Sequence, residues 1–432
     1  MRHIYIIIGF LFSFSILNGQ MVAKTKAGPF LIKGATIHPI SSAPFVGDIL
    51  IQGNRINEVA ESINTLKPVH TIEARGKHVY PGFIDAGCHL GLGEIGAVSL
   101  TNDFNEIGEF IPQMQALTAV NPNSVSIPVT RTNGVTTVFT YPSGGGISGT
   151  GALIDLIGYT PEQMYAGAKA VVMYFPSTGK RGWWDRRKPE EIKKESEKAM
   201  KKLNEVWDNA LLYAKIDSAA AHNGKSPSGY KPELEALKPV VKGEMKLIIE
   251  VNKAEDINAA LKWLKDKNFD VILSGVREGH RVTDAIMESG YPCIVGPILG
   301  MPSRASDRYD IGYTNVSKLM KAGIKVAIRT NDTENVRNLP FNAGFAATYG
   351  MGVDEALKSI TINTAEIFGV ADKYGSIEQG KMANLFISDG DPFEPKTEIT
   401  ELFINGLLVP IESRHTLLYD EFLKRSPGLE TK

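Results

Sequence analysis

The chain has 432 residues, of which 43% are hydrophobic and 22% are charged, the composition of an ordinary globular protein. Its length predicts two or three domains, or one large barrel with an accessory domain. The 47 Lys and Arg balance the 48 Asp and Glu to a net charge of -1, which argues against a nucleic acid or an anionic membrane as partner.

The N-terminus is typical of a secretory signal peptide. Arg2 and His3 precede an apolar run over residues 4–17, and Gly19 is a small residue near a plausible cleavage point. A retained membrane anchor is the alternative, but a run of about fourteen apolar residues is short for a stable span. We therefore predict a signal peptide over residues 1–19, an exported periplasmic or extracellular protein, and no stable membrane insertion after cleavage.

The two cysteines, Cys88 and Cys293, could form one disulfide in an exported chain. Each lies in or beside a run that is typical of a buried strand, where a free cysteine behaves as a small hydrophobic residue. We expect free thiols.

Both ends of the chain have β-strand patterns. Residues 30–56 contain β-branched runs separated by a turn at residues 41–44 and by Gly53-Asn54. Similar runs, again separated by Gly turns, return over residues 374–406. This arrangement predicts one sheet that is built from both chain ends.

Between these ends, apolar strand-like runs alternate with helical stretches, which indicates parallel βα units. Because no Gly-x-Gly-x-x-Gly phosphate loop accompanies them, a (β/α)8 barrel is favoured over a dinucleotide-binding sheet. The predicted strands are residues 135–141, 170–174, 246–251, 270–274, 292–295 and 325–328. The predicted helices are residues 189–222, 254–267, 282–288 and 351–366.

The most informative stretch is residues 79–96. An apolar strand with a Pro-Gly turn leads into Asp85, Cys88 and His89, and a Gly-rich loop follows. In a barrel, chemistry gathers where strands end. The polar residues at the predicted strand ends are Asp85, His89, Glu250, Asn252, His280, Arg329, Thr330, Asn331 and Asp332.

Several of these residues lie in motifs that resemble the amidohydrolase superfamily. Residues 81–89 resemble its first barrel strand, Pro-Gly-Phe-Ile-Asp-Ala-His-x-His, whose paired histidines hold a catalytic metal. The second histidine is His89, but the first is replaced by Gly87. Residues 249–257 resemble Ile-His-Ala-His-Arg-Ala-Asp-Asp-Ile, which places Glu250 at a metal-binding histidine.

Two more motifs complete the set. Glu278-Gly279-His280 matches the family's Glu-Gly-His, so His280 keeps a ligand position. Thr330-Asn331-Asp332 falls where the family has a catalytic aspartate, which places Asn331 there and Asp332 one residue away.

The resemblance spans residues 34–406 and is similar to an imidazolonepropionase-like branch. It implies a distorted (β/α)8 TIM-type barrel over residues 81–370. It also implies a small β-sandwich domain built from residues 20–80 and 371–432. The aspartate that usually follows Lys-x-Ala in the family is Asn384 in this chain.

Two functions follow from the resemblance. The first is metal-assisted hydrolysis of a non-peptide carbon-nitrogen bond in a cyclic amide or a similar small molecule. His89, Glu250, His280 and Asp332 would hold one divalent ion, with zinc the first candidate, and Asp332 would be the base. The second is a pseudo-amidohydrolase without metal, because the His-x-His pair is broken and the amide of Asn331 cannot act as a base. Such a protein would bind a small molecule, self-associate, or pair with an intact amidohydrolase.

Other interpretations of these residues stay open at this point. His89 could hydrogen-bond within the Gly-rich loop, and Glu250 could form an ion pair with Lys253, Arg277 or Arg281. Residues 141–150 could form an anion-binding nest or a surface loop. Residues 183–187, Trp-Trp-Asp-Arg-Arg, could stack on a planar ligand or form a lid or interface.

Overall fold

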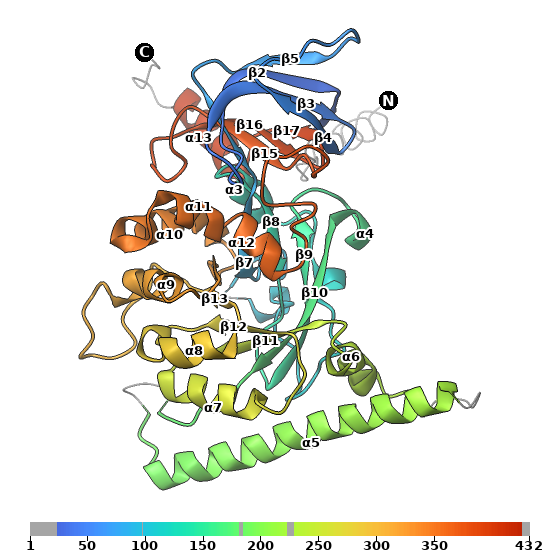
Figure 1. Cartoon of the computed structure of the whole chain (residues 1–432), viewed down its shortest axis with the longest axis vertical. Coiled ribbons are helices and arrows are strands. Elements are labelled where there is room, and N and C mark those ends of the chain that lie inside the picture. The colour runs from blue at the N-terminus through green and yellow to red at the C-terminus, as the bar shows by residue number, and fades with distance from the viewer. Residues whose placement is uncertain (1–23, 97, 181–184, 223–228, 426–432) are drawn as a thin grey trace, which may run out of the picture.

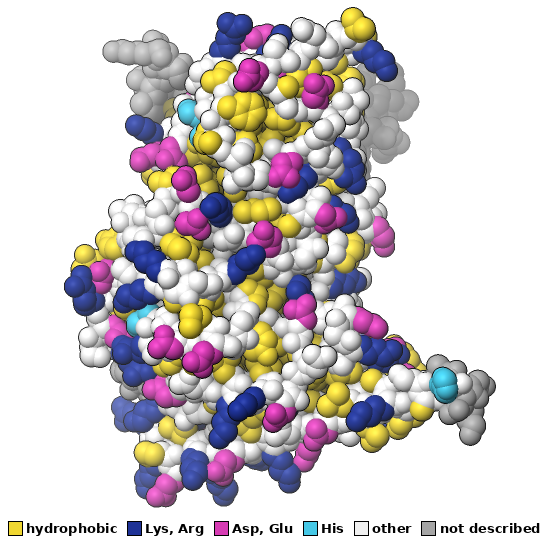
Figure 2. Space-filling view, in the orientation of Figure 1, with side chains coloured by type: hydrophobic (Ala, Val, Ile, Leu, Met, Phe, Trp, Pro, Cys, Tyr) yellow, Lys and Arg dark blue, Asp and Glu magenta, His cyan; other side chains and the backbone are white. Residues whose placement is uncertain are grey.

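The computed structural model describes residues 24–96, 98–180, 185–222 and 229–425, and it divides into a barrel and a separate sheet (Figure 1). The predicted signal peptide and the Trp183-Trp184 pair lie outside the described residues. Within the described ranges, no helix combines the length and apolar character needed to span a membrane. Figure 2 shows acidic and basic side chains intermixed over the face in view, in keeping with the balanced charge.

The sheet at one end of the molecule is built from both chain ends, as predicted. It has nine strands in the order β1-β17-β16-β15-β6-β2-β3-β4, with β5 beside β2. The strand β15 pairs antiparallel with both β6 and β16, so the C-terminal strands are central to the sheet. The strands are β1 (Lys26–Ala27), β2 (Phe30–Ile37), β3 (Phe45–Gln52), β4 (Arg55–Ala60), β5 (His70–Glu73), β6 (His78–Pro81), β15 (Leu385–Ser388), β16 (Ile399–Ile404) and β17 (Leu407–Val409).

The second sheet is the barrel, with eight strands in sequential order. Its first and last strands meet where the Asn331 N–H donates to the Gly87 carbonyl at 2.9 Å and the His89 N–H donates to the Asp332 carbonyl at 2.9 Å. The barrel strands are β7 (Phe83–Cys88), β8 (Val135–Thr140), β9 (Ile147–Asp155), β10 (Tyr165–Tyr174), β11 (Lys246–Val251), β12 (Val271–Gly275), β13 (Cys293–Val295) and β14 (Val326–Ile328).

One strand departs from the predicted parallel barrel. β9 runs antiparallel to both β8 and β10, and it includes part of the stretch that we predicted to be a loop. The remaining neighbours are parallel. The barrel is therefore a distorted (β/α)8 barrel in which one βα unit is replaced by a hairpin.

The junction between the two sheets is Gly82. The apolar run at residues 79–84 divides here, because β6 pairs with β15 in one sheet whereas β7 pairs with β8 in the other. A Cβ atom on Gly82 would lie 2.1 Å from Oγ1 of Thr136, so only glycine fits at this crossing.

Helices cover the barrel, and α7, α8, α9 and α10 lie one above another along one side of it (Figure 1). The 34-residue helix α5 has the predicted bounds, and one end of it projects from the body (Figure 1). The predicted helix over residues 351–366 is instead two helices, because Ile360 and Thr361 leave helical geometry. The α-helices are α2 (Ala116–Ala119), α3 (Ser126–Arg131), α4 (Pro161–Met164), α5 (Pro189–His222), α6 (Pro232–Val241), α7 (Ala254–Leu264), α8 (Thr283–Ser289), α9 (Ile311–Lys321), α10 (Leu339–Ala346), α11 (Val353–Ser359), α12 (Ile362–Ile367) and α13 (Arg414–Arg425).

The buried side chains follow the predicted patterns. In α7, Ile257, Ala260 and Leu264 are buried at spacings of three and four. Cys88 and Cys293 are both buried and free, as expected. Burial raises the pKa of the Cys293 thiol to about 12, so this thiol is protonated and unreactive at neutral pH.

Candidate functional site at the barrel mouth

An ion pair crosses the barrel at the carboxyl ends of the strands. Arg329 follows β14 and reaches Glu250 near the end of β11, where its two terminal nitrogens each donate to one carboxylate oxygen. The Nη2–Oε2 distance is 2.9 Å. The two side chains are only 4% and 5% exposed, so this bidentate pair is closed off from solvent.

The pair keeps both groups charged despite their burial. Burial by itself raises the pKa of Glu250, but the adjacent Arg329 guanidinium outweighs it and holds that pKa below its ordinary value. Burial likewise acts to lower the pKa of Arg329, yet Glu250 raises it above the usual range for arginine. The guanidinium is therefore a permanent positive charge at the centre of the mouth.

Two hydroxyl groups extend the pair into a network. Arg329 Nη1 donates to the Tyr141 hydroxyl at 2.8 Å and to the Ser274 hydroxyl at 2.7 Å. The Tyr141 hydroxyl in turn donates to Oδ1 of Asn331 at 2.6 Å. Asn331 has a φ of 53°, a left-handed conformation that asparagine tolerates better than most residues. Five side chains from the ends of four strands thus share one hydrogen-bonded cluster.

Gly87 leaves the space that this cluster occupies. A Cβ atom at Gly87 would lie 3.1 Å from Cδ of Arg329 and 3.2 Å from Cε1 of Tyr141, which is tighter than ordinary contact. Any side chain at this position would therefore require Arg329 and Tyr141 to shift from their present positions. The residue that breaks the predicted His-x-His pair is therefore the residue that gives Arg329 its room.

His89 lies beside this cluster. Its Nδ1–H donates to the Tyr141 carbonyl at 2.7 Å, and its ring stacks against Phe104 with centroids 5.0 Å apart. Burial is the main reason that the pKa of His89 is lowered, so the ring is neutral at neutral pH and Nε2 keeps its lone pair. Because Nδ1 of His89 is occupied, Nε2 is the ring atom that is left to bind a ligand at the mouth.

The other two predicted ligands have structural partners. His280 lies in a short 3-10 turn, where its backbone N–H and its Nδ1 both donate to Oδ1 of Asn315, at 2.9 and 3.2 Å. Oδ1 of Asp332 accepts from the backbone N–H groups of residues 333, 334 and 335 at 2.7–3.0 Å. These donors outweigh partial burial and hold the pKa of Asp332 below its ordinary value, which makes it a weak base.

Comparison with known proteins supports one superfamily. The Amidohydrolase family matches residues 240–409. The crystal structure of an amidohydrolase from Thermotoga maritima MSB8 superposes with a TM-score of 0.78 at 26% identity, over 89% of this chain and 100% of that one. These matches support an amidohydrolase superfamily member.

Curated relatives agree with this assignment. A 5-methylthioadenosine/S-adenosylhomocysteine deaminase from Thermoanaerobacter pseudethanolicus is 26% identical over 379 residues, 80% of each chain. An imidazolonepropionase from Mesorhizobium japonicum is 36% identical over 78 residues, 17% of this chain and 19% of that protein. Amidohydrolase tasK from Hapsidospora irregularis is 21% identical over 84% of this chain, which spans only 40% of tasK. Relatives in this superfamily act on carbon-nitrogen bonds.

Superfamily members are typically metal-dependent, but the residues at this mouth do not fit a metal ion. Within the described ranges, no three His, Cys, Asp or Glu side chains are grouped so that they could hold one. Glu250 has both oxygens on Arg329, and Oδ1 of Asp332 accepts three backbone N–H groups. A divalent cation would also have to lie against the Arg329 guanidinium, a like charge in a buried site. The structure therefore does not bring the predicted ligand set of His89, Glu250, His280 and Asp332 together.

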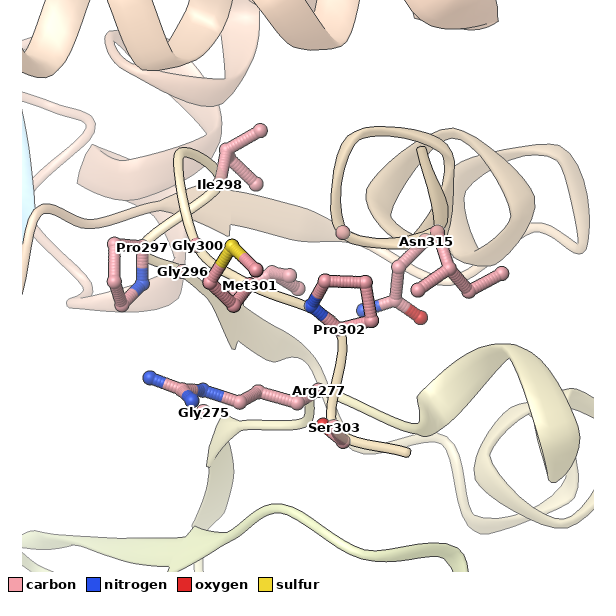
Figure 3. A pocket seen from close by; sticks show the side chains of 13 residues that line it. Gly275, Arg277, Gly296, Pro297, Ile298, Gly300, Met301, Pro302, Ser303 and Asn315 are labelled. Carbon is pink, nitrogen blue, oxygen red and sulfur yellow. The ribbon is translucent and has the colours of Figure 1, made fainter. Parts of the chain in front are cut away.

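A small pocket lies beside the pair, between the ends of β12 and β13 (Figure 3). Arg277 extends beneath Pro297 and Met301 into it (Figure 3). No ion-pair partner of Arg277 is found among the described residues, and burial and the nearby Arg329 lower its pKa. The free volume is about 20 Å³, room for one water.

Residues 141–150 and 183–187 each have two interpretations from the sequence. Of residues 141–150, only the first part is a turn, in which Gly144 and Gly145 have positive φ, and the rest belongs to β9. The Asp185 carboxylate is bonded to Arg187, so that pair stabilises its own segment. A ligand-stacking role for the two tryptophans stays a prediction.

The sequence analysis missed the partner of Glu250. It favoured Lys253, Arg277 and Arg281, which are closer along the chain. Lys253 instead donates to the Lys180 carbonyl, and Arg281 pairs with Asp307. The available signal was that Arg329 and Glu250 both follow barrel strands directly, which places both side chains at the same mouth.

Proposed function

We propose that this chain is a non-hydrolytic member of the amidohydrolase superfamily that acts as a binding protein or as a partner subunit. The observation that carries the proposal is the buried Arg329–Glu250 pair, which places a fixed positive charge at the predicted metal position. A hydrolase of this superfamily would need at least three ligands on one ion, an open position for water and a base.

One feature supports a role in binding a partner. The segment after β7 exposes large apolar side chains to solvent, among them Leu100, which is 92% exposed, and the fully exposed Ile107. Exposed apolar residues near a barrel mouth are typical of a surface that contacts another molecule.

A second candidate is hydrolysis of a carbon-nitrogen bond in a small amide. It is favoured by the similarity to a deaminase over 80% of both chains and by a similarity to an N-substituted formamide deformylase from Arthrobacter pascens, 31% identical over 111 residues. His89, with a neutral ring at the mouth, would then be the residue available to take part in the chemistry.

One experiment separates the two candidates. The purified protein is dialysed against zinc, washed, and analysed for metal content, and it is then assayed against dipeptides, lactams and hydantoins. The proposal predicts only trace metal and no turnover above a heat-treated control. Zinc at one equivalent per chain, together with turnover that chelation abolishes, would overturn it.

A further inference from the structure

A buried arginine without an acidic partner lies at the end of the barrel away from the mouth. Arg131 is the last residue of α3 and is 5% exposed. Its Nη1 donates to the Leu156 carbonyl at 3.2 Å, while its Nε is buried without a hydrogen-bond partner. Among the described residues no carboxylate forms an ion pair with this guanidinium.

Arg131 lines a small pocket, and a second buried polar group without a described hydrogen-bond partner lines it too. The hydroxyl of Ser124, a residue that is 1% exposed, also lines the pocket and has no hydrogen-bond partner among the described residues. The other lining residues include Ile127, Leu156 and Met164 together with the polar Asn123 and Tyr159. The free volume is about 40 Å³, against the roughly 10–15 Å³ that one water needs.

The buried arginines Arg329 and Arg131 differ in how their charges are neutralised. Arg329 is paired with a carboxylate, as a buried charge requires. For Arg131 the described residues offer one carbonyl acceptor, and Tyr159, which lines the same pocket, acts to raise its pKa. Burial lowers the pKa of Arg131 to about 10, so the side chain still carries its charge at neutral pH. Arg131 is therefore a buried cation that lines a cavity, has an unused N–H donor and has no anionic partner among the described residues.

We propose that this pocket binds a small monovalent anion, with Arg131 as the counter-charge and Ser124 as a second donor. The free volume suits a halide or a small carboxylate such as formate, but not a large organic anion. The site is separate from the barrel mouth, so the proposal does not depend on whether the chain hydrolyses a substrate.

The test measures thermal stability at constant ionic strength while sodium gluconate is replaced stepwise by sodium chloride or sodium formate. Gluconate serves as the large anion that the pocket excludes. A ligand that binds only the folded state raises Tm with its concentration. We expect the Tm of the wild-type chain to rise with chloride, with formate, or with both, and the salt that acts identifies the anion type.

Two variants assign the effect to the pocket. Arg131→Met is expected to abolish the anion response, whereas the matched control Arg425→Met, at an exposed arginine paired with Glu421, should keep it. Ser124→Ala should fold normally and weaken the response several-fold, which provides a test if Arg131→Met does not fold. Chloride-35 NMR line broadening that Arg131→Met removes would be direct support. No anion-specific rise in Tm for the wild type, or an unchanged response in Ser124→Ala and Arg131→Met, would overturn the proposal.

Discussion

Replacing Arg329 by methionine tests the ion pair at the barrel mouth. Methionine keeps much of the volume but removes the charge, so the Glu250 carboxylate is left buried with only neutral hydroxyl donors, those of Ser274 and of Tyr141 at 3.4 Å. Removing one partner of a buried pair costs about 3–5 kcal/mol, because the remaining charge stays uncompensated. The Tyr141 and Ser274 hydroxyls also lose a donor, which adds to the cost.

The double variant Arg329→Met with Glu250→Met has a different expected outcome. It removes both charges at once, and replacing a buried pair by apolar side chains is often neutral or stabilising, by up to about 1–4 kcal/mol. The double variant should therefore be more stable than Arg329→Met alone. This reversal distinguishes an ion pair from two independent contributions to packing.

The assay is urea unfolding at pH 7, followed by circular dichroism, with the control Arg425→Met at an exposed pair. That control should change the free energy of unfolding by less than about 1 kcal/mol. The reasoning fails if Arg329→Met costs no more than the control. It also fails if the losses of the two single variants simply add in the double variant.

Four further predictions concern the same end of the barrel. Gly87→Ala should lower the free energy of unfolding in urea by about 1–3 kcal/mol, because its Cβ would lie 3.1 Å from Cδ of Arg329. The control is Gly53→Ala, which has open space at its Cβ and is strained only by its φ of 60°. Burial raises the pKa of Asp85 to about 7. The free energy of unfolding of the wild type should therefore fall as pH rises from about 4 to 7, by roughly 4 kcal/mol at most. Asp85→Asn should flatten this pH dependence, and equal slopes for the two proteins would contradict the prediction. Asp332→Ala should cost about 0.5–2 kcal/mol through the lost backbone cap without changing metal content, and a change in metal content would restore Asp332 as a ligand. Gly87→His with Glu250→His should stay metal-poor and unstable, while adding Arg329→Ala should raise zinc uptake; zinc uptake by the double variant alone would mean that Arg329 does not block the site.

Much of the fold can be predicted from the sequence, because the residue patterns of strands and helices are local. The runs at residues 246–251 and 189–222 gave the observed bounds of β11 and α5. The exception is β9, whose Gly-rich start predicts a loop. It is a strand because β8 and β10 pair with it on both sides, a long-range effect that outweighs local preference. Gly151 in this strand is required by packing, because a Cβ there would lie 2.6 Å from Cζ of Phe139.

The candidate site is legible only in part, for a related reason. The position of Glu250 and His89 at strand ends predicts that they lie at the barrel mouth. The neighbouring residues in the sequence, however, do not predict which side chain contacts them from across the barrel. The partner of Glu250 lies 79 positions away along the chain. The caps that engage Asp332 and His280 depend on backbone geometry and on Asn315, and no residue pattern reveals them in advance.

The changes at the predicted metal positions form one packing arrangement. Gly87 provides the space that Arg329 fills, Glu250 neutralises the guanidinium that fills it, and Asn331 accepts the Tyr141 hydroxyl bound to the same guanidinium. Each residue is therefore favourable only while the others are present. A metal site that was merely losing ligands would leave orphaned histidines and an open cavity. Here the freed space is filled, the charge is paired and the hydroxyls are bonded, so restoring any one ligand destabilises the mouth before it can rebuild a site for metal.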